Sequence, residues 1–225
     1  MGAQILLHNR HSLFYRDYFQ GGNISFAKPW ITYTQPDLDM ITGSLLKGYA
    51  IFHHQAFVNI TYLDNKKVGS SLRENLIFKN RYLNRAKATI KKVLQESKMK
   101  EDPLRIGIHV RKGDWDEYAR VKNIPMITPE YYLNAMKEME RKLGTSNLVF
   151  LLITDDIKWC KTNLQVENLF IVSDFKRTIW DGIGHDLAVM SMCQHSIISW
   201  GSFSSFVGFF AGGYNIAPNG VKFMS

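Results

Sequence analysis

The sequence predicts an α/β protein built on a parallel sheet in the second half of the chain. Two short segments there, Arg105–Val110 and Leu148–Ile153, are apolar almost throughout, and stretches with helical spacing separate them from later segments of the same kind. Strands that are apolar on both faces and alternate with helices are typical of a parallel sheet covered on both sides. The chain has 225 residues, 45% of them hydrophobic and 21% charged, which argues against a disordered or fibrous protein.

We expect two regions, residues 1–102 and residues 103–225. The first is rich in aromatic residues, shows helical spacing around Leu38–Phe57 and has no clear series of strands, so we expect it to be mainly helical. Asp102-Pro103 then punctuates the chain, and the alternation of apolar strands and helices begins. The second region is therefore predicted to be the α/β unit.

The net charge of +8 is concentrated in a helix predicted between Arg73 and Lys100. Nine lysines and arginines stand there against two glutamates, and apolar residues recur at intervals of three and four. The apolar stripe consists of Leu76, Leu83, Ala86, Ile90, Val93 and Leu94. We interpret the basic side as a solvated helix face, because no aromatic residues are interleaved with its charges. Contact with nucleic acid or a membrane surface is the alternative.

The second region has clear signals for where its elements begin and end. Thr128 and Pro129 mark the start of a helix that ends before Gly144. Further strands are expected at Leu169–Val172, Ser196–Ser199 and Tyr214–Ala217, and further helices at Asp155–Leu164, Asp186–Cys193 and Phe203–Ala211. Such a Rossmann-like unit binds ligands beyond the carboxyl ends of its strands. The chemistry is therefore expected at Val110–Asp116, Thr154–Asp156, Ser173–Asp174 and Ser199–Ser205.

The first strand of this unit ends in the sequence HVRKGDW, in which His109 and Arg111 lie on the same side. A guanidinium at the end of a parallel strand, with Gly113 following, is well placed to bind a phosphate through two hydrogen bonds. Taken alone, a histidine in such a place is more often a core residue, and an arginine more often an ion-pair partner.

The strand predicted at Ser196–Ser199 leads into a serine-rich turn and a helix. Hydroxyl groups and free backbone N–H groups at a helix N-terminus form an anion site, and simple capping by Ser202 or Ser204 is the alternative. Asp186, expected at the start of the preceding helix, is suited to accept hydrogen bonds from a ribose or a base, or it merely caps that helix.

Other nucleotide and metal signatures are weak in this chain. It has no P-loop, and Gly182-Ile183-Gly184 lacks the third glycine of a dinucleotide fingerprint. No histidine or cysteine pair has the spacing of a metal site. Asp114-Trp115-Asp116 has the D-x-D form that metal-dependent sugar transferases use, but Arg111 offers a metal-free way to neutralise the same diphosphate. Cys160 and Cys193 are too few for a disulfide-built scaffold, and we interpret them as small buried residues whose pairing stays open.

With both strand ends in view, the sequence resembles the alpha-1,2-fucosyltransferase family. Residues 109–115 are similar to its H-V-R-R-G-D-Y signature, with Lys112 in place of the second arginine and Trp115 in place of tyrosine. Three further motifs match in order, at residues 154–163, 186–195 and 199–213. Residues 72–78 (LRENLIF) also fit the family's helix before the signature strand.

The resemblance implies transfer of fucose from GDP-fucose to the 2-hydroxyl of a galactoside, with inversion and with neither a metal ion nor a cofactor. It also implies that residues 103–225 are the donor-binding half of a GT-B-like fold. Arg111 would hold the diphosphate and stabilise the charge that develops on the departing GDP, and His109 would support it. The remaining donor contacts would come from Asp155, Asp186, Ser202, Ser204 and Ser205.

Inverting transfer also needs a base for the acceptor hydroxyl. The nearby carboxylates are Asp114, Asp116 and Glu117, and Asp114 is the one we place in the catalytic set. Lys112 loses the bidentate donor that an arginine would supply, which weakens one phosphate or structural contact.

Family members begin with a short tail, a membrane anchor and an N-terminal α/β half, none of which precedes Met1. We therefore expect an N-terminally truncated chain on the lumenal side of the Golgi membrane, where only the missing anchor would contact lipid. Asn23 and Asn59 begin glycosylation acceptor triplets. The uncharged stretch Gln194–Val221 contains too much serine and glycine for a membrane span.

Three hypotheses about function follow. The leading one is an active fucosyltransferase whose partners are GDP-fucose and a galactose-terminated glycan, with no nucleic acid. The second is an inactive or donor-binding-only relative, suggested by the missing N-terminal half. The third is a basic nucleic-acid-binding protein that uses the helix between Arg73 and Lys100.

Overall fold

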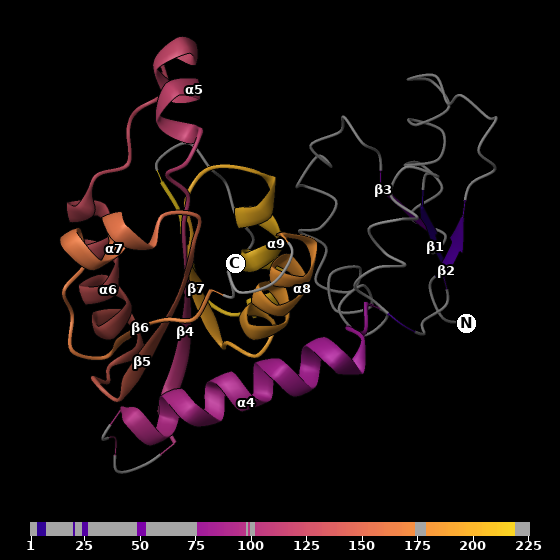
Figure 1. Ribbon diagram of the computed structural model, residues 1–225, viewed down its shortest axis with the longest axis horizontal. Coiled ribbons are helices and arrows are strands. Elements are labelled where there is room, and N and C mark those ends of the chain that lie inside the picture. Colours follow the sequence, from indigo (N-terminus) through magenta and orange to yellow (C-terminus); the bar gives the residue numbers. More distant parts are fainter. Residues whose placement is uncertain are drawn as a thin grey trace. The chain divides into compact units, whose positions relative to one another are not determined.

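The computed structural model describes residues 4–7, 20, 24–26, 49–52, 76–97, 99, 102–173 and 179–218 (Figure 1). The chain divides into two compact units, one from Met1 to Asn80 and one from Arg81 to Phe223. Each unit has a parallel sheet of its own.

The sheet of the first unit has three short strands. These are β1 (Gln4–Leu7), β2 (Ile24–Phe26) and β3 (Tyr49–Phe52), in the order β2-β1-β3. The helical spacing expected around Leu38–Phe57 is therefore wrong over β3, because so short a run does not distinguish a strand from a helix by its periodicity. The mainly helical character of residues 1–102 stays a prediction, since most of residues 1–75 lie outside the described part of the chain.

The second unit is built on a five-stranded parallel sheet, as predicted. Its strands are β4 (Leu104–Val110), β5 (Leu148–Thr154), β6 (Leu169–Ile171), β7 (His195–Ile197) and β8 (Asn215–Ile216). They lie in the order β6-β5-β4-β7-β8. From β4 the chain first adds β5 and β6 on one side, and it then adds β7 and β8 on the other side of β4. The direction of winding reverses between β4 and β7, which is the topological switch point at which such sheets bind ligands.

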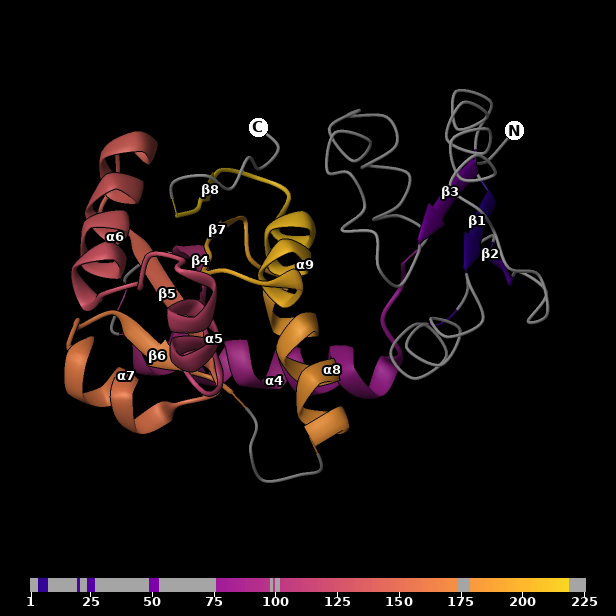
Figure 2. The same ribbon diagram turned by 90° about the horizontal axis from the view of Figure 1, so that it is seen from above.

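Six helices are described in and next to this unit. They are α4 (Asn80–Glu96), α5 (Trp115–Lys122), α6 (Pro129–Leu143), α7 (Ile157–Asn163), α8 (Ile179–Met190) and α9 (Ser202–Ala211). Helices α6 and α7 cover one face of the sheet, and α8 and α9 cover the other (Figure 2). The sheet is thus shielded from water on both faces, which explains why its central strands β4 and β5 are mainly apolar.

The core between α6 and the sheet is formed by fully buried apolar side chains. Tyr132 and Met139 of α6 pack against Ile106, Ile108 and Leu152 of β4 and β5. On the other face, close packing requires a glycine: a Cβ on Gly107 of β4 would lie 2.6 Å from Sδ of Met190 in α8.

The sequence analysis missed or misplaced two helices. Helix α8 begins at Ile179, so Asp186 lies in the second half of the helix instead of opening it. Gly182 and Gly184 are both buried inside the helix, where tertiary packing outweighs their low helix propensity. Helix α5 was not predicted, because Ala119 is the one buried residue among the side chains described in it, which leaves no apolar stripe to detect.

Candidate functional site

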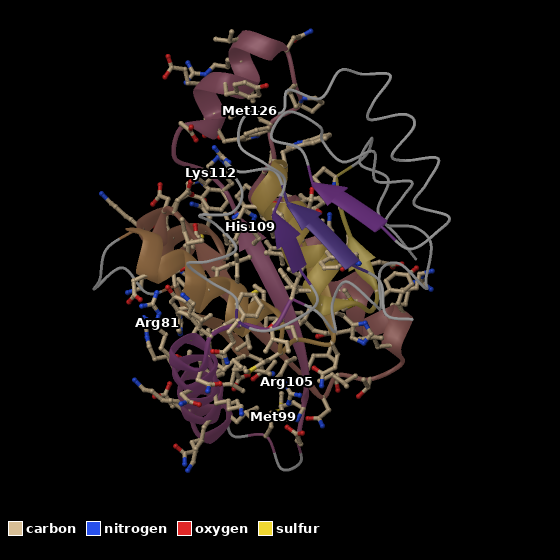
Figure 3. The ribbon with its side chains drawn as sticks, turned by 90° about the vertical axis from the view of Figure 1, so that its right-hand side faces the viewer. Arg81, Met99, Arg105, His109, Lys112 and Met126 are labelled. Atoms are coloured by element: carbon tan, nitrogen blue, oxygen red, sulfur yellow. The ribbon has the colours of Figure 1, made fainter. Side chains whose placement is uncertain are left out.

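The switch point brings together the two strand ends singled out in the sequence. β4 and β7 are direct neighbours, with Ile106 opposite His195 and Ile108 opposite Ile197. The segments that follow them, from His109 onward and from Ser199 onward, therefore leave the sheet side by side. Figure 3 shows His109 and Lys112 toward one end of the sheet and Arg105 toward the other.

His109 lies in a buried hydroxyl cluster. Its Nδ1 is 2.6 Å from Oγ of Ser204 and 3.3 Å from Oγ of Ser199, and the two hydroxyl oxygens are 3.1 Å apart. Burial, together with the charge of Arg111, lowers the pKa of His109 to about 3, so the imidazole is neutral at physiological pH. A neutral imidazole tied to two serines fixes the end of β4 to the start of α9. The sequence placed Ser199 in the predicted segment Ser199–Ser205 but gave it no contact, because its approach to His109 appears only when β4 and β7 are paired.

Arg111 is the cation at this edge of the sheet. Its Nη2 donates to Oδ1 of Asp114 at 2.9 Å, and its guanidinium carbon lies 5.6 Å from the ring centroid of Trp115. The side chain of Arg111 is 31% exposed and that of Asp114 is 78% exposed, so the pair is open to solvent. A pair in such surroundings contributes at most about 1 kcal/mol, which makes the carboxylate replaceable by another anion.

The N-terminus of α9 lies beside the same guanidinium. A Cβ added to Gly201 would be 3.4 Å from Nη1 of Arg111, so the arginine rests against the residue that caps the helix. Gly201 has φ +106°, a conformation that favours glycine, and the first N–H groups of a helix have no partner within it. A guanidinium and a helix N-terminus directed at the same region favour the binding of an anion.

Three other predicted donor contacts lie on α9. Ser204 is fully buried and also donates to the backbone O of Trp200 at 3.2 Å. Its hydroxyl therefore bonds both to His109 and to the backbone at the start of α9. The hydroxyl of Ser205 lies 3.4 Å from the backbone O of Gly201. Ser202 is the first residue of α9, and its side chain is outside what the structure describes.

Asp155 holds the loop after β4. Its Oδ1 accepts a hydrogen bond from the backbone N–H of Lys112 at 2.7 Å, and a Cβ on Gly113 would lie 2.7 Å from its Oδ2. Lys112 itself is only 11% exposed, because its Nζ pairs with Asp116 at 2.8 Å and lies 4.7 Å from the ring centroid of Trp159. Lys112 therefore makes a structural contact, one of the two roles considered for the family's arginine at this position.

Asp186 belongs to a polar contact between α4 and α8. Its Oδ1 is 2.9 Å from Nδ1 of the buried His185, whose Nε2 is 3.0 Å from Oγ1 of Thr89. In the same interface, Arg85 pairs with Asp181 at 2.7 Å. These groups lie along the helix pair, whereas the Arg111 cluster lies at the strand ends.

The three carboxylates considered as a base differ in their surroundings. Hydrogen bonding and charge from Arg111 lower the pKa of Asp114, and Asp116 is paired with Lys112. Glu117 is exposed. The D-x-D carboxylates thus both face cations, and the described residues contain no group of three or more potential metal ligands.

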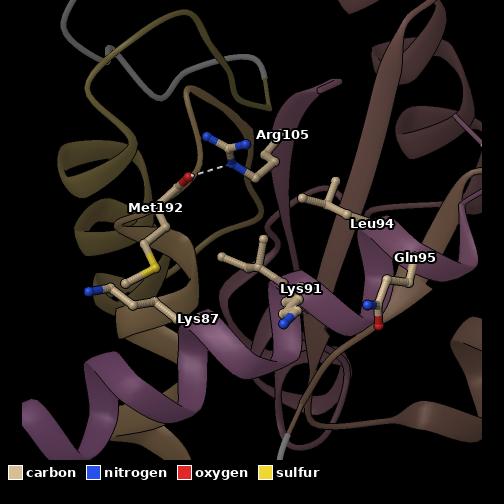
Figure 4. Close-up of a pocket in the computed structure, with 7 residues that line it drawn as sticks. Lys87, Lys91, Leu94, Gln95, Arg105 and Met192 are labelled. Atoms are coloured by element: carbon tan, nitrogen blue, oxygen red, sulfur yellow. Dashed lines mark hydrogen bonds between the residues drawn. The ribbon is translucent and has the colours of Figure 1, made fainter. Parts of the chain in front are cut away.

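An open groove of about 760 Å³ lies away from this site, toward the amino end of β4 (Figure 4). It is lined by Lys87, Ile90, Lys91, Leu94, Gln95, Arg105 and Met192. Nε of Arg105 donates to the backbone O of Met192 at 3.0 Å. The amphipathic helix predicted between Arg73 and Lys100 is present here as α4, with Ala86, Ile90 and Val93 buried, but it begins at Asn80, so Leu76 of the predicted apolar stripe lies before it.

Cys160 and Cys193 are separate buried thiols, and burial raises the pKa of Cys160 to about 11 and that of Cys193 to about 12. Asn23 and Asn59 lie outside the described residues. Among the helices that the structure describes, none combines the length and the apolar character that crossing a membrane requires.

A doubly wound parallel sheet with a guanidinium and a helix N-terminus at its switch point defines the class of protein as α/β, with a candidate ligand site at the carboxyl ends of its strands. Residues 41–219 match the sequence model of Glycosyl transferase family 11. The chain belongs to this family, and the resemblance found in the sequence motifs is confirmed.

Relatives in the family have names that agree on the linkage they form. The chain is 26% identical over 117 residues to galactoside 2-alpha-L-fucosyltransferase SEC1 of Bos taurus, a match that covers 49% of this chain and 30% of that protein. It is 30% identical over 101 residues to an alpha-1,2-colitosyltransferase of Escherichia coli, covering 44% of this chain and 33% of that protein. The matches thus span about a third of these relatives.

The fold is shared with a solved fucosyltransferase. The structure of fucosyltransferase NodZ from Bradyrhizobium matches with a TM-score of 0.53 at 10% identity, covering 94% of this chain and 91% of that one. At this identity the likeness shows the fold, and it confirms the predicted α/β architecture.

Proposed function

We propose that the protein transfers fucose from GDP-fucose to the 2-hydroxyl of a galactoside. The observation that carries the proposal is the position of Arg111, whose guanidinium lies against Gly201 at the N-terminus of α9 and beside the switch point. Two fixed sources of positive potential at one place suit a diphosphate. Glycosyl transferase family 11 and the names of the relatives supply the reaction class and the linkage.

The reaction follows from these groups. The acceptor oxygen attacks the anomeric carbon of fucose from the side opposite the diphosphate, its proton passes to a carboxylate base, and the bond from that carbon to the phosphate oxygen breaks. The diphosphate of GDP leaves with the bonding pair, and Arg111 and the α9 N-terminus stabilise its increasing charge. His109, held neutral between Ser199 and Ser204, positions β4 and α9 for this role.

Asp114 is the base we propose. While Arg111 holds it, its pKa is lowered and it is a weak proton acceptor. A bound diphosphate would take over the guanidinium and release the carboxylate beside the transferred sugar. Asp155 would keep the loop after β4 in place, and Ser202 and Ser205 would support the phosphate end of α9. Asp186, which His185 holds in the α4–α8 contact, is assigned to the nucleoside by family resemblance alone.

We also propose that no metal ion takes part, since Arg111 and the helix N-terminus supply the charge that a cation would otherwise bring. By family resemblance, the protein would work on the lumenal side of the Golgi membrane, with Asn23 and Asn59 as glycosylation sites. Family membership favours a transferase over the nucleic-acid alternative. The inactive or donor-binding-only alternative is distinguished from an active transferase by measuring GDP binding and fucose transfer.

The test combines GDP binding with transfer. Calorimetry should show GDP binding to the wild-type chain and at least a tenfold loss in Arg111→Ala, about 1.4 kcal/mol or more. Arg141→Ala is the matched control, because Arg141 forms a similar exposed pair with Glu138 on α6, away from the strand ends. Absence of GDP binding in the wild type would overturn the proposal.

Transfer is then measured in EDTA with GDP-fucose and a methyl β-galactoside. Fucosylation at the 2-hydroxyl supports the full proposal, whereas GDP binding without transfer supports the donor-binding-only relative. Because one relative is named a colitosyltransferase, a GDP-colitose arm tests the identity of the sugar.

A further inference from the structure

Helix α5 carries exposed apolar side chains beside the proposed donor site. Tyr118 is 47% exposed and Val121 is 75% exposed, and Met126 in the following segment is exposed as well. The helix projects beyond the carboxyl edge of the sheet, and Met126 lies on the same side of the molecule as Lys112 (Figures 1 and 3). Single exposed apolar residues need no explanation, but several on one projecting element indicate a binding surface.

A series of aromatic contacts links this surface to Arg111. The guanidinium carbon of Arg111 lies 5.6 Å from the ring centroid of Trp115, and the Trp115 ring lies 5.1 Å from that of Tyr118 with an interplanar angle of 37°. Tyr118 follows Trp115 by three residues, so the two side chains share one side of the helix. The exposed Tyr118 ring is thus separated from the proposed phosphate position by a single aromatic side chain. The acceptor sugar must lie about one side chain away from the phosphate position, because its hydroxyl has to reach the donor sugar attached to that phosphate.

The chemistry of the surface suits a sugar. A pyranose ring presents a face of C–H groups that packs on an aromatic ring and an edge of hydroxyl groups that donates to carboxylates. Tyr118 offers the ring, and Glu117, the preceding residue of the helix, is an exposed carboxylate on the neighbouring side. We propose that the Tyr118 ring is the platform on which the acceptor galactoside stacks. This proposal rests on the proposed function, since the galactoside is the acceptor of that reaction.

A second protein is a poorer fit for the same surface. A stable protein interface buries about 20–30 residues on each side, whereas this surface consists of three apolar side chains on and after a helix of eight residues. A single sugar ring covers an area of the size that one aromatic side chain offers.

The experiment measures galactoside binding without requiring turnover. Binding of methyl β-galactoside to the full chain in the presence of GDP is followed by saturation-transfer NMR, and GDP binding is followed by calorimetry. Tyr118→Ala should weaken galactoside binding about tenfold and leave GDP binding within about twofold of wild type. Tyr118→Phe keeps the ring and should bind like wild type. Tyr214→Ala, which removes another exposed aromatic ring next to the amino end of β8, is the control.

The possible outcomes separate this proposal from the proposed function. Equal galactoside binding in Tyr118→Ala and wild type overturns the platform, as does an equal loss of galactoside and GDP binding, which would indicate a structural role. A change in sedimentation of both Tyr118→Ala and Val121→Ala, with galactoside binding unchanged, would show an interface between copies and also overturns it. If wild type binds the galactoside through Tyr118 but does not bind GDP, the platform stands and the donor proposal fails.

Discussion

Arg111 and Asp114 form an ion pair at the position where the proposed function requires a diphosphate. Their contact of 2.9 Å is between residues three apart in the chain, so it forms locally as soon as the β4–α5 loop folds. Asp114 stands at the N-cap of α5, yet its side chain makes no capping hydrogen bond. The carboxylate therefore competes with any incoming anion for the guanidinium, and the competition is weak because both groups face solvent.

Asp114→Asn should consequently bind GDP about two- to fivefold more tightly than wild type while transferring fucose more slowly. The neutral amide no longer occupies Arg111 as a counter-charge, and it cannot accept the acceptor's proton. Calorimetry and initial rates measure the two effects. Glu138→Gln, which disturbs the comparable pair with Arg141 on α6, should change neither. Weaker GDP binding in Asp114→Asn would show that the carboxylate supports the site instead of competing for it.

His109 makes stability depend on pH. Its pKa is about 3 in the folded protein, against about 6.5 in the unfolded chain, so between these values the unfolded state binds more protons. The contribution of neutral His109 to the free energy of unfolding is therefore fully present above about pH 6.5. It is lost as the pH falls toward 3, by an amount on the order of a few kcal/mol.

Urea unfolding at several pH values from 7 to 4 measures this dependence. We expect His109→Gln to be less stable at pH 7, since the buried hydroxyl cluster loses a well-placed partner. Its free energy of unfolding should also fall less steeply with acid than that of wild type. Parallel curves for the two proteins would mean that His109 titrates normally in the fold.

At the scale of elements, the N-terminus of α9 depends on a backbone conformation that only glycine adopts easily. Gly201→Ala places a Cβ at φ +106° and 3.4 Å from Nη1 of Arg111. We expect a loss of about 1–3 kcal/mol of stability, together with roughly tenfold weaker GDP binding, because the arginine must move.

Gly212→Ala is the matched control at the other end of the same helix. Gly212 has φ +71° at the C-cap, so the substitution should cost about 1–2 kcal/mol of stability. GDP binding at the opposite end of α9 should be unaffected. Thermal unfolding and calorimetry of both variants separate the two effects, and an equal loss of GDP affinity in both would indicate general destabilisation of α9.

A comparison of two helices shows how far local sequence signals determine the fold. Helix α6 begins at Pro129 after Thr128 and ends before Gly144 in the left-handed conformation, as its sequence predicts. Helix α8 contradicts its local signals, since two glycines lie buried within it. A helix whose boundaries depend on packing against β4 and α4 cannot be placed from its own residues.

At the scale of the whole molecule, the stability of the second unit depends on the core between the sheet and its helices. Leu152 of β5 is fully buried in the cluster that includes Tyr132 and Met139 of α6. Leu152→Ala should cost about 2–5 kcal/mol and lower the Tm by roughly 5–15 °C, because a cavity replaces well-packed methyl groups. Circular dichroism measures the shift, and Val121→Ala, at an exposed position, should leave the Tm nearly unchanged.

The sequence alone determined the class of the fold and the residues at its two critical strand ends. Buried parallel strands must be apolar throughout, and helix boundaries use residues with distinct backbone preferences, so these features are written in local patterns. His109, Arg111 and the serines of α9 could be named for the same reason.

Only the tertiary structure decided what those residues contact. Pairing β4 with β7 turned Ser204 toward His109 and brought Arg111 against Gly201, and pairing β4 with β5 left Lys112 packed on Trp159. These contacts join residues as many as 95 positions apart, as His109 and Ser204 are. No periodicity or spacing along the chain encodes such distances, because they result from the order in which strands assemble into the sheet.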